Sequence, residues 1–188
     1  GVGPEVIAEA ERVLEAAAER FALPLELERF PDGADHYLAT GVTLPAGQMD
    51  RFGDDFAAIL VGAFGDPRVP DNRHAADILL GMRFELDLYV NFRPCRLYDA
   101  RLCPIKDKRE ADVDVAIFRE NTEGLYVGVG GVFKRGTPDE ITVQEEINTR
   151  KGVERIVRAA FDWARANGRR EVLMADKANA MAHGHGLW

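Results

Sequence analysis

The stretch FRENTEGLYVGVGG, residues 118–131, places a run of polar side chains directly after a short apolar run. Val115, Ala116 and Ile117 lead into it and predict a buried strand. An arginine, two glutamates, an asparagine and a threonine follow, and then a tyrosine inside a glycine-rich apolar run. So many hydrogen-bonding groups at the end of one strand call for a structural or a chemical reason.

The composition narrows the class of protein. The formal net charge is -8, which disfavours nucleic acid as a partner because phosphate binding needs basic surface. Serine is absent, so a serine nucleophile is excluded. No stretch approaches the ~20 apolar residues of a membrane span, and no signal peptide is visible. Cys95 and Cys103 form no CxxC pair. We therefore expect a cytoplasmic protein without a membrane or nucleic-acid partner.

The hydrophobic pattern predicts alternating strands and helices. Apolar residues at helical spacing predict helices over residues 4–21, 75–87 and 151–167. Strands are expected over residues 25–30, 56–63, 88–92, 113–118, 125–133, 141–147 and 172–175. The continuous apolar run at 56–63 is typical of a buried parallel strand. Together these elements predict an α/β layer architecture.

Three arginines lie near predicted strand ends or turns, namely Arg93, Arg101 and Arg119. A guanidinium binds a carboxylate through two parallel hydrogen bonds, so three of them could converge on a small polycarboxylate. The alternative is ordinary surface arginines, because an acidic protein offers many partners for them. Spacing alone favours this second interpretation.

Other polar residues also allow two interpretations. Tyr126 is either a structural residue or a general acid. Lys177, after a short apolar run, is either solvated or a proton shuttle. Asn179 is expected to cap a helix. The HGHG stretch with His183 and His185 gives only weak evidence of a metal site.

Two further features carry little functional signal. The Gly1-Val2-Gly3 turn is a weak phosphate cradle, because a third glycine and a preceding strand are missing. Glu145 and Glu146 are expected to be solvated. The chain opens on a loop without a preceding strand and stops at Trp188 in a predicted helix start, so we expect a piece of a longer protein.

Four ordered motifs are more specific together than any one of them. They are GVGPEV at residues 1–6, LDLYVNFRP at 86–94, FRENTEGLYVGVGG at 118–131 and DKANAM at 176–181. In this order they resemble the β-decarboxylating dehydrogenases, which act on 3-isopropylmalate, isocitrate, homoisocitrate or tartrate and malate. The resemblance implies part of a two-domain α/β fold of the isopropylmalate/isocitrate dehydrogenase type, not a Rossmann fold. Residues 1–98 would belong to the large domain and 99–188 to the small dimerisation domain.

The resemblance also implies roles for individual residues. The three arginines named above resemble those that bind the substrate carboxylates. Tyr126 resembles the acid that protonates the enol after decarboxylation. Lys177 resembles the lysine that takes the proton from the substrate hydroxyl, reaching across a homodimer interface into the partner's site. Asn179 resembles the asparagine near the nicotinamide.

The implied cofactors are NAD and Mg²⁺ or Mn²⁺. In the family the metal ligands are aspartates that follow the DKAN segment, so no metal ligand is expected among these residues. The apolar Leu79 and Leu80 suit an isopropyl group better than a third carboxylate, which implies 3-isopropylmalate as substrate and a place in leucine biosynthesis. Homoisocitrate, isocitrate and tartrate or malate remain alternatives. A carboxylate-binding or dimerisation module is the non-enzyme alternative.

Overall fold

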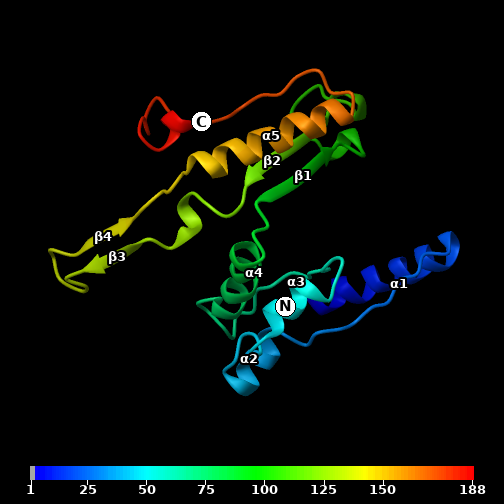
Figure 1. Ribbon diagram of the computed structural model, residues 1–188, viewed down its shortest axis with the longest axis horizontal. Coiled ribbons are helices and arrows are strands. Elements are labelled where there is room, and N and C mark those ends of the chain that lie inside the picture. The colour runs from blue at the N-terminus through cyan, green and yellow to red at the C-terminus, as the bar shows by residue number, and fades with distance from the viewer. Residues whose placement is uncertain (1–2) are drawn as a thin grey trace. The chain divides into compact units, whose positions relative to one another are not determined.

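The computed structural model describes residues 3–188, so the first two residues of the GVGPEV motif lie outside the described part (Figure 1). The chain divides into two compact units, Gly1–Leu86 and Asp87–Trp188. Residues 87–98 pack within the second unit, because their strand pairs with one that follows residue 99. The assignment of residues 1–98 and 99–188 to a large and a small domain stays a prediction.

The first unit consists of helices joined by extended segments. The helices are α1 (Gly3–Phe21), α2 (Ala34–Thr40), α3 (Gln48–Asp54) and α4 (Arg73–Glu85). Phe52, Ile78 and Met82 form its buried apolar cluster. The Phe30 ring packs edge-on against Phe52, with the centroids 5.1 Å apart. The predicted helices at 4–21 and 75–87 are thus confirmed to within two residues at each end.

The two strands predicted in the first unit are wrong. Residues 25–30 and 56–63 form no strand among the residues that the structure describes. The end of the second segment lies against α1: a side chain on Gly62 would come within 2.9 Å of Ile7 Cγ1. A β-strand exists only with a neighbour that completes its hydrogen-bond ladder, and no strand pair is described in this unit. The apolar run packs without a ladder.

The second unit contains two antiparallel strand pairs and a long helix. Its strands are β1 (Val90–Arg96), β2 (Asp114–Glu120), β3 (Gly130–Phe133) and β4 (Ile141–Gln144). The helix α5 covers Arg150–Ala166. Short 3-10 turns are η1 (Ala100–Leu102), η2 (Glu110–Asp112), η3 (Leu125–Val127) and η4 (His185–Leu187). Helices and strands together make an α/β fold, of which the described residues form a part.

The β1–β2 sheet has one covered face and one open face. Helix α5 lies along β2 (Figure 1), and Trp163 packs against Phe92 and Phe118 with ring centroids 5.4 and 5.7 Å apart. Side chains alternate between faces along a strand, so Val115 and Ile117 lie on the other face. They are 52% and 46% exposed. The prediction that this strand is buried is therefore wrong for one of its two faces.

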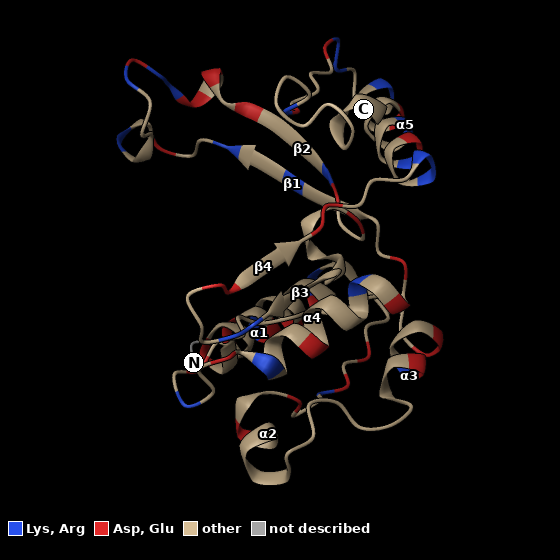
Figure 2. Ribbon diagram, turned by 90° about the vertical axis from the view of Figure 1, so that its left-hand side faces the viewer, with Lys and Arg blue, Asp and Glu red and all other residues tan. Residues whose placement is uncertain are grey.

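Helix α5 follows its sequence pattern closely. Thr149 caps its start by accepting a hydrogen bond from the Gly152 N–H, 3.0 Å. Gly168, just beyond its end, has a left-handed φ of 64°, as expected of a helix stop. Its outer side carries charges of both signs (Figure 2). These features confirm the helix predicted at 151–167.

The remaining predicted strands are only partly confirmed. The segment 125–133 begins as the turn η3 and becomes extended only in β3. The segment 141–147 is a strand up to Gln144. Residues 172–175 are not a strand in the described chain. Nor does any helix within residues 3–188 combine the length and apolar character needed to cross a bilayer.

Asp114 connects the start of β2 to the segment after α5 and should make stability depend on pH. Arg169 Nη2 donates to its carboxylate at 2.7 Å, and this hydrogen bond lowers the pKa of Asp114. A carboxyl whose pKa is lower in the folded than in the unfolded state stabilises the fold above the ordinary aspartate pKa of about 3.9. That contribution is lost as the pH falls through the folded-state value.

We therefore expect Asp114→Asn to lower the urea midpoint near neutral pH. The difference from the wild type should shrink as the pH falls below about 3.9 and through the lower folded-state pKa of Asp114, because the stabilising charge on the wild-type carboxyl is then lost. In an Arg169→Met background the same substitution should have a clearly smaller effect. An equal effect at all pH values would contradict the assignment.

Candidate functional site

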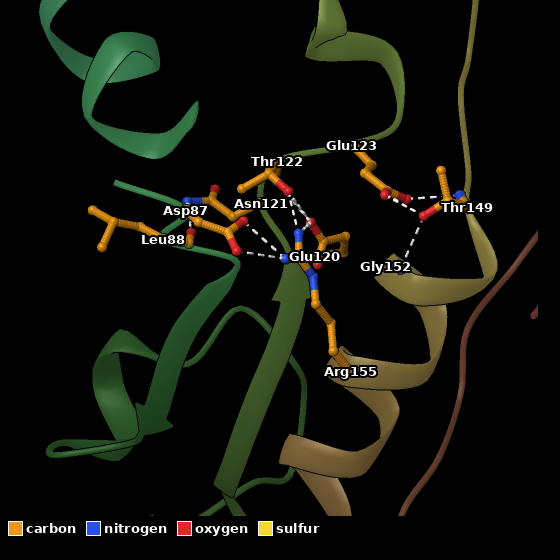
Figure 3. A network of polar contacts seen from close by, with 9 residues as sticks. All are labelled: Asp87, Leu88, Glu120, Asn121, Thr122, Glu123, Thr149, Gly152 and Arg155. Carbon is orange, nitrogen blue, oxygen red and sulfur yellow. Dashed lines mark hydrogen bonds and ion pairs between the residues drawn. The ribbon is translucent and has the colours of Figure 1, made fainter. Parts of the chain in front are cut away.

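Arg93 and Arg119 lie on the open face of the β1–β2 sheet. In the strand register Asn91 pairs with Arg119, and Arg93 is two residues further along β1, so all three side chains share one face. Arg93 Nε donates to Asn91 Oδ1 at 2.9 Å, and Asn91 Nδ2 donates to Asn121 Oδ1 at 3.1 Å. Asn121 in turn donates to the Leu88 carbonyl at 3.1 Å (Figure 3). Two asparagines that the sequence left without a role thus orient Arg93.

Tyr126 lies against Arg119. The guanidinium carbon is 5.0 Å from the centroid of the tyrosine ring, a cation–π contact. Tyr126 belongs to η3, and its side chain is half exposed. The turn after β2 therefore brings a phenol back to Arg119, the next-to-last residue of that strand. This pair joins two of the predicted site residues.

Arg101 is positioned differently from the other two arginines. Its side chain is 88% exposed and belongs to the turn η1. Its Nη2 and Nε donate to Asp99 Oδ2 at 2.5 and 3.0 Å, and hydrogen bonding to Asp99 raises the pKa of Arg101. The guanidinium is thus paired with a carboxylate of its own turn, and binding a substrate carboxylate would require exchange with Asp99.

The first glutamate of the RENTEG turn, Glu120, is a structural residue. Its side chain is 5% exposed, and its Oε1 lies 3.2 Å from Nη2 of Arg155 on α5. The same guanidinium donates to the Thr122 hydroxyl and, at 2.8 Å, to Asp87 just before β1 (Figure 3). Burial acts to lower the pKa of Arg155, but the hydrogen bonds to Glu120 and Asp87 outweigh it and raise that pKa. One largely covered cation therefore holds three segments together.

The second glutamate, Glu123, anchors the start of α5. It accepts hydrogen bonds from the Thr149 backbone N–H at 2.8 Å and from the Thr149 hydroxyl at 2.5 Å. Thr149 Oγ1 accepts in turn from Gly152 N (Figure 3). A Cβ on Gly152 would collide with the Glu123 carboxylate, so a larger residue there would displace this carboxylate from its place beside Thr149. Sequence reasoning missed this anchor, although a threonine just before an amphipathic helix is a capping signal.

Lys177 and Asn179 lie in the C-terminal loop. The Lys177 carbonyl accepts from the Ala180 and Met181 N–H groups at 2.9 and 2.8 Å, and its own N–H donates to His185 Nδ1 at 2.8 Å. Both Lys177 and Asn179 are exposed, and neither takes part in the contacts of the Arg93–Arg119 face described above. Asn179 lies in a turn, so its expected role as a helix cap is wrong.

Leu79 and Leu80 lie on α4 in the first unit. Both are half-buried, and Leu79 packs against the cluster of Phe52, Ile78 and Met82. Part of the Leu79 surface is therefore already used in the core of its own unit. Their role as a lining for an isopropyl group stays a prediction.

The described residues do not fit a divalent cation. Within residues 3–188 no three side chains of the His, Cys, Asp and Glu types gather as a potential metal site. The two glutamates of the RENTEG turn are held by Arg155 and Thr149. Carboxylates engaged in this way are not available as the oxygen ligands that Mg²⁺ or Mn²⁺ prefers.

Comparisons with known proteins agree with the motif order. The sequence profile of the family described as isocitrate/isopropylmalate dehydrogenase matches residues 1–188. A 3-isopropylmalate dehydrogenase of Thermobifida fusca is 42% identical over 188 residues, covering all of this chain and 53% of that protein. A tartrate dehydrogenase/decarboxylase of Pseudomonas putida is 40% identical over 190 residues, covering all of this chain and 52% of its own length.

The fold has a counterpart among solved structures. The crystal structure of isocitrate dehydrogenase from Methylococcus capsulatus superimposes with a TM-score of 0.74 at 27% identity, covering all of this chain and 51% of that one. The chain thus spans about half the length of the relatives it matches.

Replacing Arg155 should test how far the site depends on the buried ion pair. Arg155→Met leaves the Glu120 carboxylate without its cation, and removing one partner of a buried pair costs about 3–5 kcal/mol. We expect the free energy of unfolding from urea titration to fall by roughly the lower end of this range, since the Arg155 side chain is still 15% exposed.

The matched control is Arg158→Met, also on α5. Arg158 pairs with Glu154 at the surface, and such a pair contributes about 0.5 kcal/mol or less. If both substitutions cost the same, the buried network has no special role in stability.

Proposed function

Since the chain belongs to the isocitrate/isopropylmalate dehydrogenase family, we propose that the protein oxidatively decarboxylates a 2-hydroxy acid of the malate type. NAD supplies the hydride acceptor in this proposal. Oxidation at C2 yields a 2-oxo acid with a carboxylate β to the ketone, which loses carbon dioxide to leave an enol. We also propose a requirement for Mg²⁺ or Mn²⁺, and assign none of the described residues to the ion.

The observation that carries the proposal is the common face of Arg93 and Arg119, with Tyr126 against the second arginine. Two guanidiniums on one rigid sheet can hold the carboxylates of a malate core by bidentate hydrogen bonds. In this proposal Tyr126, next to one of them, would donate its phenolic proton to the enol. Arg101 would join the substrate by exchanging Asp99 for a substrate carboxylate.

The proposed base is Lys177, which would take the proton from the substrate hydroxyl. Its position away from the contacts of the arginine face supports a site completed by a partner subunit. The β3–β4 hairpin also exposes apolar side chains, among them Val132, Phe133 and Ile141. An exposed apolar hairpin with open strand edges suits pairing with a second copy. We therefore propose a homodimer with shared active sites, in which Asn179 lies near the nicotinamide.

For the substrate we propose 3-isopropylmalate, which would place the enzyme in leucine biosynthesis in the cytoplasm. Sequence identity alone separates the alternatives poorly, since 3-isopropylmalate and tartrate dehydrogenases are 42% and 40% identical to the chain. The choice rests on the apolar Leu79 and Leu80. Tartrate or malate is the second candidate, favoured by the similar identity. Isocitrate and homoisocitrate, which carry a third carboxylate, would favour more polar or basic side chains in this part of α4.

Substituting Lys177 tests the reaction itself. Lys177→Met in the complete protein should lower kcat by at least ~100-fold, because loss of a general base costs about that factor. The melting temperature should change little, since the side chain is exposed. Turnover is followed as NADH formation with 3-isopropylmalate.

Lys108→Met provides the control, as Lys108 is an exposed lysine in the loop between β1 and β2. Its turnover should equal that of the wild type. Retention of activity in the Lys177 variant to within a few fold would remove the proposed base.

Substrate choice is tested by competition among hydroxy acids. An apolar pocket discriminates by about 1–3 kcal/mol for one or two methylenes. We expect kcat/KM to be higher for 3-isopropylmalate than for malate, tartrate, isocitrate or homoisocitrate. A ranking with tartrate or a tricarboxylate first would reject the role of Leu79 and Leu80, while turnover of none of them would favour a binding module.

A further inference from the structure

The HGHG stretch gains a role once its second histidine is seen in place. The imidazole of His185 lies between two partners: the Lys177 backbone N–H is 2.8 Å from Nδ1, and Glu146 Oε1 is 2.9 Å from Nε2. Its first histidine, His183, is exposed. The two histidines therefore do not form a pair of metal ligands. Instead, His185 contacts the backbone of Lys177.

The hydrogen bonds define the form of the imidazole. A backbone N–H can only donate, so Nδ1 must be the acceptor and Nε2 must carry the proton. Nε2–H then donates to the Glu146 carboxylate. Only the neutral imidazole with its proton on Nε2 satisfies both neighbours at once, because a doubly protonated ring offers no acceptor to Lys177.

The carboxylate that orients this ring is itself held. The Glu146 side chain is 15% exposed, so the expectation that it is solvated is wrong. Asn148 Nδ2 donates to the same Oε1 at 3.0 Å, and Trp188 Nε1 donates to Asn148 Oδ1 at 3.0 Å. These contacts tie the C-terminal loop to the segment after β4, across 39 residues of sequence.

We propose that His185 is a positioning residue for Lys177, with Glu146 fixing its tautomer. The loop closes on itself through the Lys177 carbonyl, which accepts from Ala180 and Met181, and through the His185 N–H, which donates to Met181 at 2.8 Å. The His185 ring holds the Lys177 N–H and at the same time reaches a different segment through Glu146. It therefore fixes the position of the Lys177 backbone, from which the lysine side chain would extend toward the substrate. This inference rests on the proposed role of Lys177 as the base.

Two substitutions of His185 test its Nδ1 and Nε2 hydrogen bonds separately. Asn reaches about as far as Nδ1 and can accept from the Lys177 N–H, whereas Gln reaches about as far as Nε2 and can only maintain the bond to Glu146. We expect His185→Gln to lower kcat by about tenfold with KM nearly unchanged, since misplacement of a reacting group by about an ångström can cost up to 100-fold. His185→Asn should stay within about threefold of the wild type.

The outcomes decide the proposal. Equal loss in both variants, or no loss in His185→Gln, overturns it, because a merely structural histidine would not distinguish an acceptor at one ring position from a donor at the other. Melting temperatures of both variants are measured alongside to exclude unequal folding.

A second measurement needs neither activity nor substitution. In the wild-type protein with ¹⁵N-lysine, the Lys177 amide should exchange with solvent clearly more slowly than the exposed Lys108 amide, and equal exchange overturns the His185 contact. If the wild type turns over none of the hydroxy acids, the proposed function fails instead. Protection of the Lys177 amide would still show that the contact forms.

Discussion

The second unit depends on the ion pair between Arg155 and Glu120. A single guanidinium on α5 reaches the end of β2, the turn that follows it and the residue that leads into β1. Two buried charges are costly to desolvate, so the pair adds little net stability against an apolar alternative, but either charge alone is strongly unfavourable. Arrangements that separate α5 from the strand ends are therefore penalised, and the sheet and the helix are held in one relative position.

This constraint explains the density of polar groups at the end of β2. Neighbouring residues of a strand point to opposite faces, so Arg119 faces the open side while Glu120 faces α5. A slip of the β1–β2 register by one residue would exchange the two faces and leave a carboxylate exposed and an arginine against the helix. The motif thus combines a candidate binding group, Arg119, with an anchoring group, Glu120. The contact of Glu120 with α5 keeps Arg119 on the open face of the sheet.

Short-range sequence patterns predicted the helices, but not the strand pairing or the long-range ion pairs. The helical periodicity was sufficient for α1, α4 and α5, and a single motif contains both Arg119 and Tyr126, which the structure brings into contact. The apolar runs at 25–30 and 56–63 resembled strands, but whether a ladder forms depends on a neighbour that no local window contains. Arg155 is 68 residues from Asp87 and 35 from Glu120, so no spacing rule could have paired them.

The sequence likewise predicted some residues of the candidate site but not the contacts that orient them. Arginines and a tyrosine can be recognised by residue type, whereas the Asn91–Asn121 bridge that orients Arg93 spans 30 residues and joins two motifs. Many arginines of this acidic chain are neutralised by nearby carboxylates, as Arg101 is by Asp99. Arg93 and Arg119, in contrast, contact a neutral amide and an aromatic ring. Neutral partners orient a guanidinium without cancelling its charge. These two arginines therefore keep an electrostatic attraction for a carboxylate ligand, while Arg101 must first give up its own.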